Sequence, residues 1–125
     1  MMQPSKEIIG QRVRNRIIEY FELISGTEAT SSPLGLNEII NTWDDWTDAE
    51  LLKNEAVHPF TSIEVTALLR FDSKLRDFCS VTPQDIADDH AEMLRPEWAV
   101  LVLEAQQALG VFRQRGYLSE DLEQL

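Results

Sequence analysis

The sequence predicts an all-α fold, a single irregular bundle of about five to seven helices over residues 1–125. Apolar residues recur every three or four positions in several segments, which is the period of one face of a helix. Motifs that start helices recur between these segments. The length of 125 residues corresponds to about one domain, and 43% apolar with 26% charged residues is ordinary for a globular protein.

The N-terminal segment predicts the first helix. Pro4 and Ser5 are start signals, and Gly26 is a stop signal. The expected apolar face comprises Ile9, Val13, Ile17, Phe21 and Ile24. Residues 26–35 are small and polar and include a proline, so we expect a loop there.

Two tryptophans fall where a second helix is expected to end. The helical spacing resumes with Leu36, Ile39, Ile40 and Trp43. Thr47–Glu50 forms a capping box, in which the threonine and the glutamate each bond the other's backbone amide, so a further helix is expected to start there. The stretch "WDDW" therefore lies at a helix junction. We expect Trp43 to point mostly inward and Trp46 to be partly exposed.

Two further helix starts follow. Thr61–Glu64 is a second capping box, and its helix carries Val65, Leu68, Phe71, Leu75 and Phe78. Thr82 and Pro83 predict another start, with the proline at the first helical position. On that helix one face would be acidic, with Asp85, Asp88, Asp89 and Glu92. The opposite face would carry Ile86, His90, Met93 and Leu94.

The last helix is expected from about Pro96 to Arg115 and should be central in the bundle. One apolar face passes through Trp98, Leu101, Ala105, Ala108, Leu109 and Phe112, and Val100, Leu103 and Val111 extend it around the side. Gly116 ends this helix, and Ser119 is expected to cap a short turn. The predicted core comprises Trp98, Leu101, Leu109, Phe112, Leu68, Phe71, Ile17 and Phe21.

The net charge of −11 limits the partners that the protein can bind. Nucleic acid and anionic membranes are disfavoured because both require a basic surface, whereas a basic protein would be attracted. Residues 28–64 hold eight acids against Lys53, for −7, and residues 83–98 hold five acids against Arg95, for −4. If these two segments are neighbours in space, the protein has one strongly negative face.

Motifs of catalysis and of metal binding are not found in the sequence. There is no G-x-S-x-G motif and no glycine-rich phosphate loop. Ala87 lies three residues before His90, so the Glu-x-x-His motif of carboxylate-bridged metal sites fails. Cys79 is the single cysteine and is expected to be a small buried apolar residue, which fits a reducing, cytoplasmic location. We expect no cofactor and no metal, and an enzyme is the less favoured reading.

We therefore predict a small acidic protein-binding module, of the kind of an immunity protein that covers a basic partner. Trp46 would be the anchor, and the nearby carboxylates would steer the partner. The candidate binding residues are Asp44, Asp45, Trp46, Asp48, Glu50, Asp85, Asp88, Asp89 and Glu92. Two alternatives stay open: a helical enzyme or ligand-binding protein with a pocket near His90, and a subunit of a homo-oligomer. The sequence leaves the oligomeric state undetermined.

Overall fold

The computed structural model of the protein describes residues 5–26, 35–46 and 60–122. Within these residues it contains five helices and no strand, which confirms the all-α prediction. The helices are α1 (Lys6–Ser25), α3 (Leu36–Trp46), α5 (Ser62–Val81), α6 (Asp89–Met93) and α7 (Pro96–Arg113). None of these helices is both long and apolar enough to cross a membrane.

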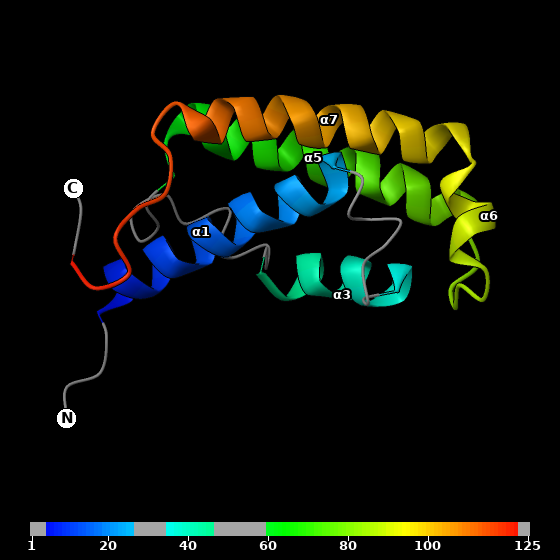
Figure 1. Cartoon of the computed structure of the whole chain (residues 1–125), viewed down its shortest axis with the longest axis horizontal. Helices are drawn as coiled ribbons and strands as arrows, with labels where there is room; N and C mark the ends of the chain where they lie inside the picture. Colours follow the sequence, from blue (N-terminus) through cyan, green and yellow to red (C-terminus); the bar gives the residue numbers. More distant parts are fainter. Residues whose placement is uncertain (1–4, 27–34, 47–59, 123–125) are drawn as a thin grey trace.

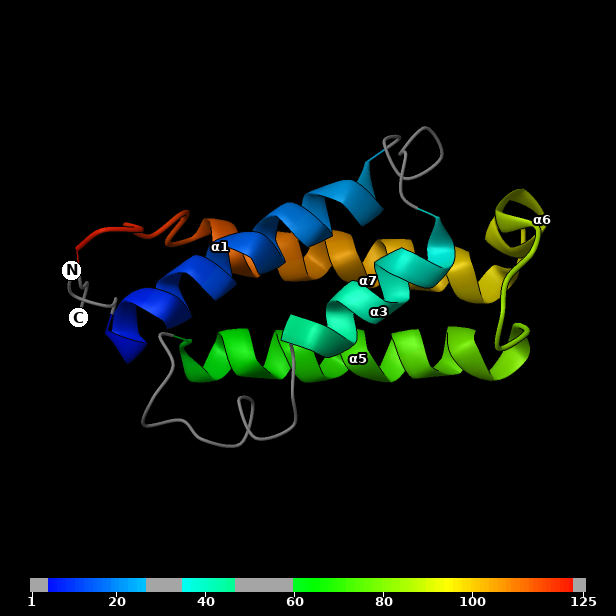
Figure 2. The same cartoon turned by 90° about the horizontal axis from the view of Figure 1, so that it is seen from below.

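The helices α5 and α7 lie side by side along the length of the molecule (Figure 1). α7 also packs against α1 and, at its start, against α6, so the prediction of a central last helix is confirmed. Seen from below, α3 crosses the face between α1 and α5 (Figure 2). The segment that joins α5 to α7, including α6, forms one end of the bundle (Figures 1 and 2).

Three predicted helix starts are confirmed, and each depends on residues close to it in sequence. The Ser5 hydroxyl accepts a hydrogen bond from the Ile8 amide at 3.2 Å and so caps α1. Thr61 and Glu64 form both bonds of the capping box at 3.2 and 3.1 Å. Pro96 occupies the first turn of α7, where its missing N–H group costs no hydrogen bond.

The predicted helix start at Pro83 is wrong, because α6 begins at Asp89. Asp88 is the residue that caps α6, with its carboxylate accepting from the Ala91 amide at 3.1 Å. The backbone of Ile86 bonds instead to the Asn37 side chain, through N–H at 3.1 Å and through its carbonyl at 3.0 Å. These bonds replace the intrahelical bonds that Ile86 would make. The single acidic helix face expected over residues 85–92 therefore does not form.

The predicted core is confirmed for all eight of its residues. Trp43 is fully buried as expected, with its ring centroid 4.6 Å from that of Phe71 and 5.7 Å from that of Phe21. The Trp46 side chain lies outside the described residues. Some expected apolar positions are instead exposed, namely Ile9 at 50%, Val100 at 44% and Leu103 at 58%. For α7 the reason is that α5 and α1 cover only one side of the helix.

Candidate functional site

The two acidic segments of the sequence are joined at the start of α3. The Asn37 side chain forms hydrogen bonds with both the amide and the carbonyl of Ile86. The Leu36 amide donates to the Asp89 carboxylate at 3.1 Å. Asn37 also donates to the Asp85 carboxylate at 3.3 Å. The condition that the two acidic segments are neighbours is therefore met for residues 35–46 and 83–98, but not for residues 60–64, where Glu64 pairs with Arg14 and Arg115.

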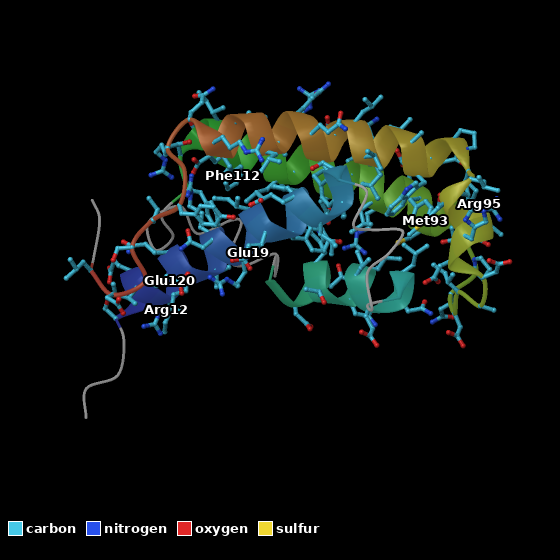
Figure 3. All side chains as sticks on the ribbon, in the orientation of Figure 1. Arg12, Glu19, Met93, Arg95, Phe112 and Glu120 are labelled. Carbon is cyan, nitrogen blue, oxygen red and sulfur yellow. The ribbon has the colours of Figure 1, made fainter. Side chains whose placement is uncertain are left out.

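Acidic residues gather at this end of the bundle, which we call the acidic end and define as residues 35–46 and 72–97. It holds ten acids against three bases. The acids are Glu38, Asp44, Asp45, Asp72, Asp77, Asp85, Asp88, Asp89, Glu92 and Glu97, and the bases are Lys74, Arg76 and Arg95. The other described residues hold seven acids and seven bases. The net charge of the described chain is therefore confined to one end, where Figure 3 labels Met93 and Arg95.

A groove runs through the acidic end between α3 and the last turns of α5. Its volume is about 720 Å³, and residues 82–86 close its third side. The α3 wall consists of Asn37, Ile40, Asn41 and Asp44, which share one face of the helix. The opposite wall includes Arg76 and Cys79 of α5. Acidic, basic, amide and apolar side chains thus line the same groove.

Arg76 of α5 joins the two walls of the groove at one end through an ion pair with α3. It forms ion pairs with Asp44 and, at 3.2 Å, with Asp72. The hydrogen bond that Arg76 donates to the Asp44 carboxylate raises the pKa of Arg76 above its ordinary value. The same Asp72 oxygen accepts from the indole N–H of Trp43 at 3.0 Å. The buried tryptophan therefore helps to position the carboxylate that binds Arg76.

The predicted binding acids of the 83–98 segment have different roles in the structure. Asp85 is exposed at the groove. Asp88 caps α6 and Asp89 bonds the first amide of α3, so both carboxylates stabilise helix ends. Glu92 is buried and forms an ion pair with Arg95. Of these four acids, Asp85 lines the groove.

The predicted acids near "WDDW" are described only in part. Asp44 is exposed and paired with Arg76. Asp45 is exposed and forms no ion pair within the described residues. Asp48 and Glu50 lie outside the described residues, as does the side chain of the proposed anchor Trp46.

His90 and the groove do not form one site in the part of the chain that the structure covers. His90 is exposed on α6 and lines neither this groove nor the smaller cavities beside α7. His58 lies outside the described residues. Cys79 is half-buried rather than buried as predicted, and burial raises the pKa of its thiol. No three His, Cys, Asp or Glu side chains of the described residues are grouped to hold a metal ion.

A second cavity, of about 150 Å³, lies between α5 and α7. Ile63, Ala67 and Val111 line it, and the Arg70–Glu104 ion pair at 3.1 Å lies on its edge. Its charged groups neutralise each other, so this cavity does not extend the acidic surface.

Sequence reasoning missed the polar residues that hold the chain together over long separations. In α1, Gln11 and Asn15 are buried and bind the backbone of the C-terminal segment, while Arg12 donates to the Glu120 carbonyl at 2.9 Å (Figure 3). Asn37 has the same function in the acidic end. Gln11 and Asn15 are four residues apart in the sequence, and this spacing indicates a polar face of α1 that could bind another segment. Nothing local marks Asn37.

Comparisons with protein-family models, with curated proteins and with solved structures give no match for this chain. The acidic end and its groove are therefore the features from which function is inferred.

Proposed function

We propose that this protein is a small acidic protein-binding module that docks a basic protein partner through its acidic end. An antagonist of the immunity type, which covers the basic surface of its target, fits this description. We also propose a reducing, cytoplasmic location, because a single cysteine cannot form an internal disulfide.

The observation that carries the proposal is the separation of charge along the bundle. Ten acids against three bases lie at the acidic end, and the rest of the described chain is balanced. Such a surface attracts a positively charged protein in an oriented way and raises the association rate at low ionic strength. Acids spread evenly for solubility would not orient a partner.

The hydrogen-bonded arrangement of the acidic end also supports the proposal that it docks a basic protein. The hydrogen bonds between Asn37 and Ile86, and the one that Asp89 accepts from the Leu36 amide, hold α3 against residues 85–89, so the carboxylates are presented on a defined surface. A defined surface loses less conformational freedom when it binds, which favours affinity.

The test compares two pairs of substitutions that change the charge equally. Asp45→Asn with Asp77→Asn removes two exposed acids from the acidic end, and Glu7→Gln with Asp121→Asn removes two exposed acids elsewhere. A protein captured from the native cell by the wild-type chain is identified by mass spectrometry and purified. Its association with each variant is then measured as a function of salt.

We expect the captured protein to be basic and to associate several-fold more slowly with the Asp45/Asp77 variant, with a weaker salt response. The Glu7/Asp121 variant should match the wild type. Equal effects of both pairs, or association that does not depend on salt, would contradict the proposal.

A further inference from the structure

We propose that the groove between α3 and α5 receives an arginine side chain from an extended segment of the basic partner, with the guanidinium at Asp85. This inference rests on the proposed function and names the chemistry that the acidic end recognises. It makes Asp85 the residue that selects the partner's cation, whereas the other acids mainly attract it.

The length of the groove sets the size of the ligand. Asn37 and Asp44 lie at its two ends and are seven residues apart on α3, which corresponds to about 10 Å along a helix. About three residues of extended chain cover this distance. The bonds between Asn37 and Ile86 lie at one end, and the ion pair between Arg76 and Asp44 lies at the other. A short segment with one central long side chain therefore fits the groove.

The apolar part of the groove suits the methylene groups of a long basic side chain. Ile40 and Cys79 are partly buried against the core, and Ile86 is buried. Lysine and arginine lay their methylene chains on such surfaces and keep the charged group beside a polar one. An acidic or small polar side chain would gain nothing from these contacts.

Asp85 is the carboxylate that remains available in the groove. Asp44 is already paired with Arg76, which also binds Asp72. Asp85 is exposed, and within the described residues its carboxylate accepts only from the neutral Asn37 amide, at 3.3 Å. A cation that enters the groove therefore meets an unneutralised carboxylate at the Asn37 end.

The remaining polar groups of the groove favour arginine over lysine. Asn41 and Gln84 are exposed in the lining and offer amide oxygens near the same space. A planar guanidinium carries five N–H donors and can bind a carboxylate and amide oxygens together, and it is more weakly hydrated than an ammonium group.

The single cysteine provides a direct readout, because Cys79 lies in the groove wall. The probe is the capped tripeptide acetyl-Ala-Arg-Ala-amide, and its counterpart carries citrulline, which has nearly the same shape without the charge. The rate at which a thiol reagent modifies Cys79 in the full chain is measured with increasing peptide. We expect the arginine peptide to slow modification in a saturable way and the citrulline peptide to have no effect.

Two variants that each remove one negative charge distinguish binding in the groove from attraction by the overall negative charge of the acidic end. Asp85→Asn should weaken protection by the arginine peptide about tenfold, the loss of one charge-assisted hydrogen bond. Asp77→Asn removes an acid from α5 outside the groove and should leave protection within about twofold of the wild type. Circular dichroism checks that both variants retain the helical signal.

Equal weakening by both substitutions, or equal protection by both peptides, would overturn the groove as an arginine site. Either result leaves the proposed function intact as long as the Asp45/Asp77 pair still slows association with the basic partner. The reverse result, in which arginine protects Cys79 but neither acid pair changes partner association, would overturn the proposed function and retain the groove.

Discussion

Glu64 joins three parts of the chain through one carboxylate. Arg14 of α1 donates to it at 2.8 and 3.3 Å, and Arg115, which follows α7, donates to it at 3.0 Å. Arg14 is fully buried, and its guanidinium also lies 5.1 Å from the ring centre of Phe112. A buried charge that loses its partner is costly, so this carboxylate holds α1, α5 and the end of α7 in register.

We therefore expect Glu64→Gln to lower the free energy of unfolding by about 3–5 kcal/mol, because Arg14 would keep a buried charge without its carboxylate. Chemical denaturation measures this loss. Glu7→Gln, at an exposed position of α1, is the control and should change stability by less than about 0.5 kcal/mol. A loss for Glu64→Gln as small as that of the control would show that the ion pairs do not stabilise the fold.

The same carboxylate makes stability depend on pH. Burial alone would raise the pKa of Glu64, but hydrogen bonds from Arg115 and Arg14 outweigh burial and lower it below its ordinary value of 4.5. Because the folded pKa lies below the unfolded one, this stabilisation is fully present above the unfolded value and is lost as pH falls through the folded pKa. Denaturation in the acid range should show a smaller loss for Glu64→Gln than for the wild type.

At the scale of the elements, α7 has one buried side and one exposed side although both carry apolar residues. Leu101 is fully buried, whereas Leu103 is 58% exposed. A uniform apolar pattern does not tell which side of a helix its neighbours will cover. The positions of α5 and α1 decide it.

These two leucines allow a matched comparison on one helix. Leu101→Ala should cost about 2–5 kcal/mol of stability through lost burial and the cavity it leaves. Leu103→Ala should cost less than about 1 kcal/mol, because its side chain already contacts water. The two values come from the same denaturation measurement, and similar costs would mean that α7 is covered on both sides.

The contact between α3 and the segment before α6 depends on one amide side chain. Asn37→Ala should remove both bonds to Ile86 and increase hydrogen exchange at the Ile86 amide, with a global cost of about 1–2 kcal/mol. The control is the substitution Asn41→Ala, at a position one turn further along the same face of α3. Unchanged exchange at Ile86 in the Asn37 variant would show that other contacts hold this segment.

At the scale of the whole molecule, like charges concentrated at one end repel each other in the absence of a partner. Salt screens this repulsion, so we expect the melting temperature to rise as ionic strength increases from low values to about 0.15 M. The Asp45→Asn, Asp77→Asn variant should show a smaller rise, because it reduces the repulsion at its source. The Glu7→Gln, Asp121→Asn variant should respond to salt as the wild type does, and the opposite order would place the repulsion elsewhere.

Local sequence patterns specify the helical class, the starts at Ser5, Thr61 and Pro96, and the core residues of α5 and α7. These features depend on interactions within four residues, or on a helical period that the sequence displays directly. The total charge and its division between two segments are also properties of the sequence alone.

The acidic end and the groove could not be predicted from local patterns, because both depend on pairs of residues far apart in the chain. The bonds between Asn37 and Ile86, which are 49 positions apart, join α3 to the segment before α6, and α6 begins at Asp89 rather than at Pro83. That contact joins residues 35–46 to residues 85–89, and the groove at Asp85 lies between them and α5. No local pattern specifies such a pairing, because an amide side chain bonds equally well to any free backbone group that packing brings near it.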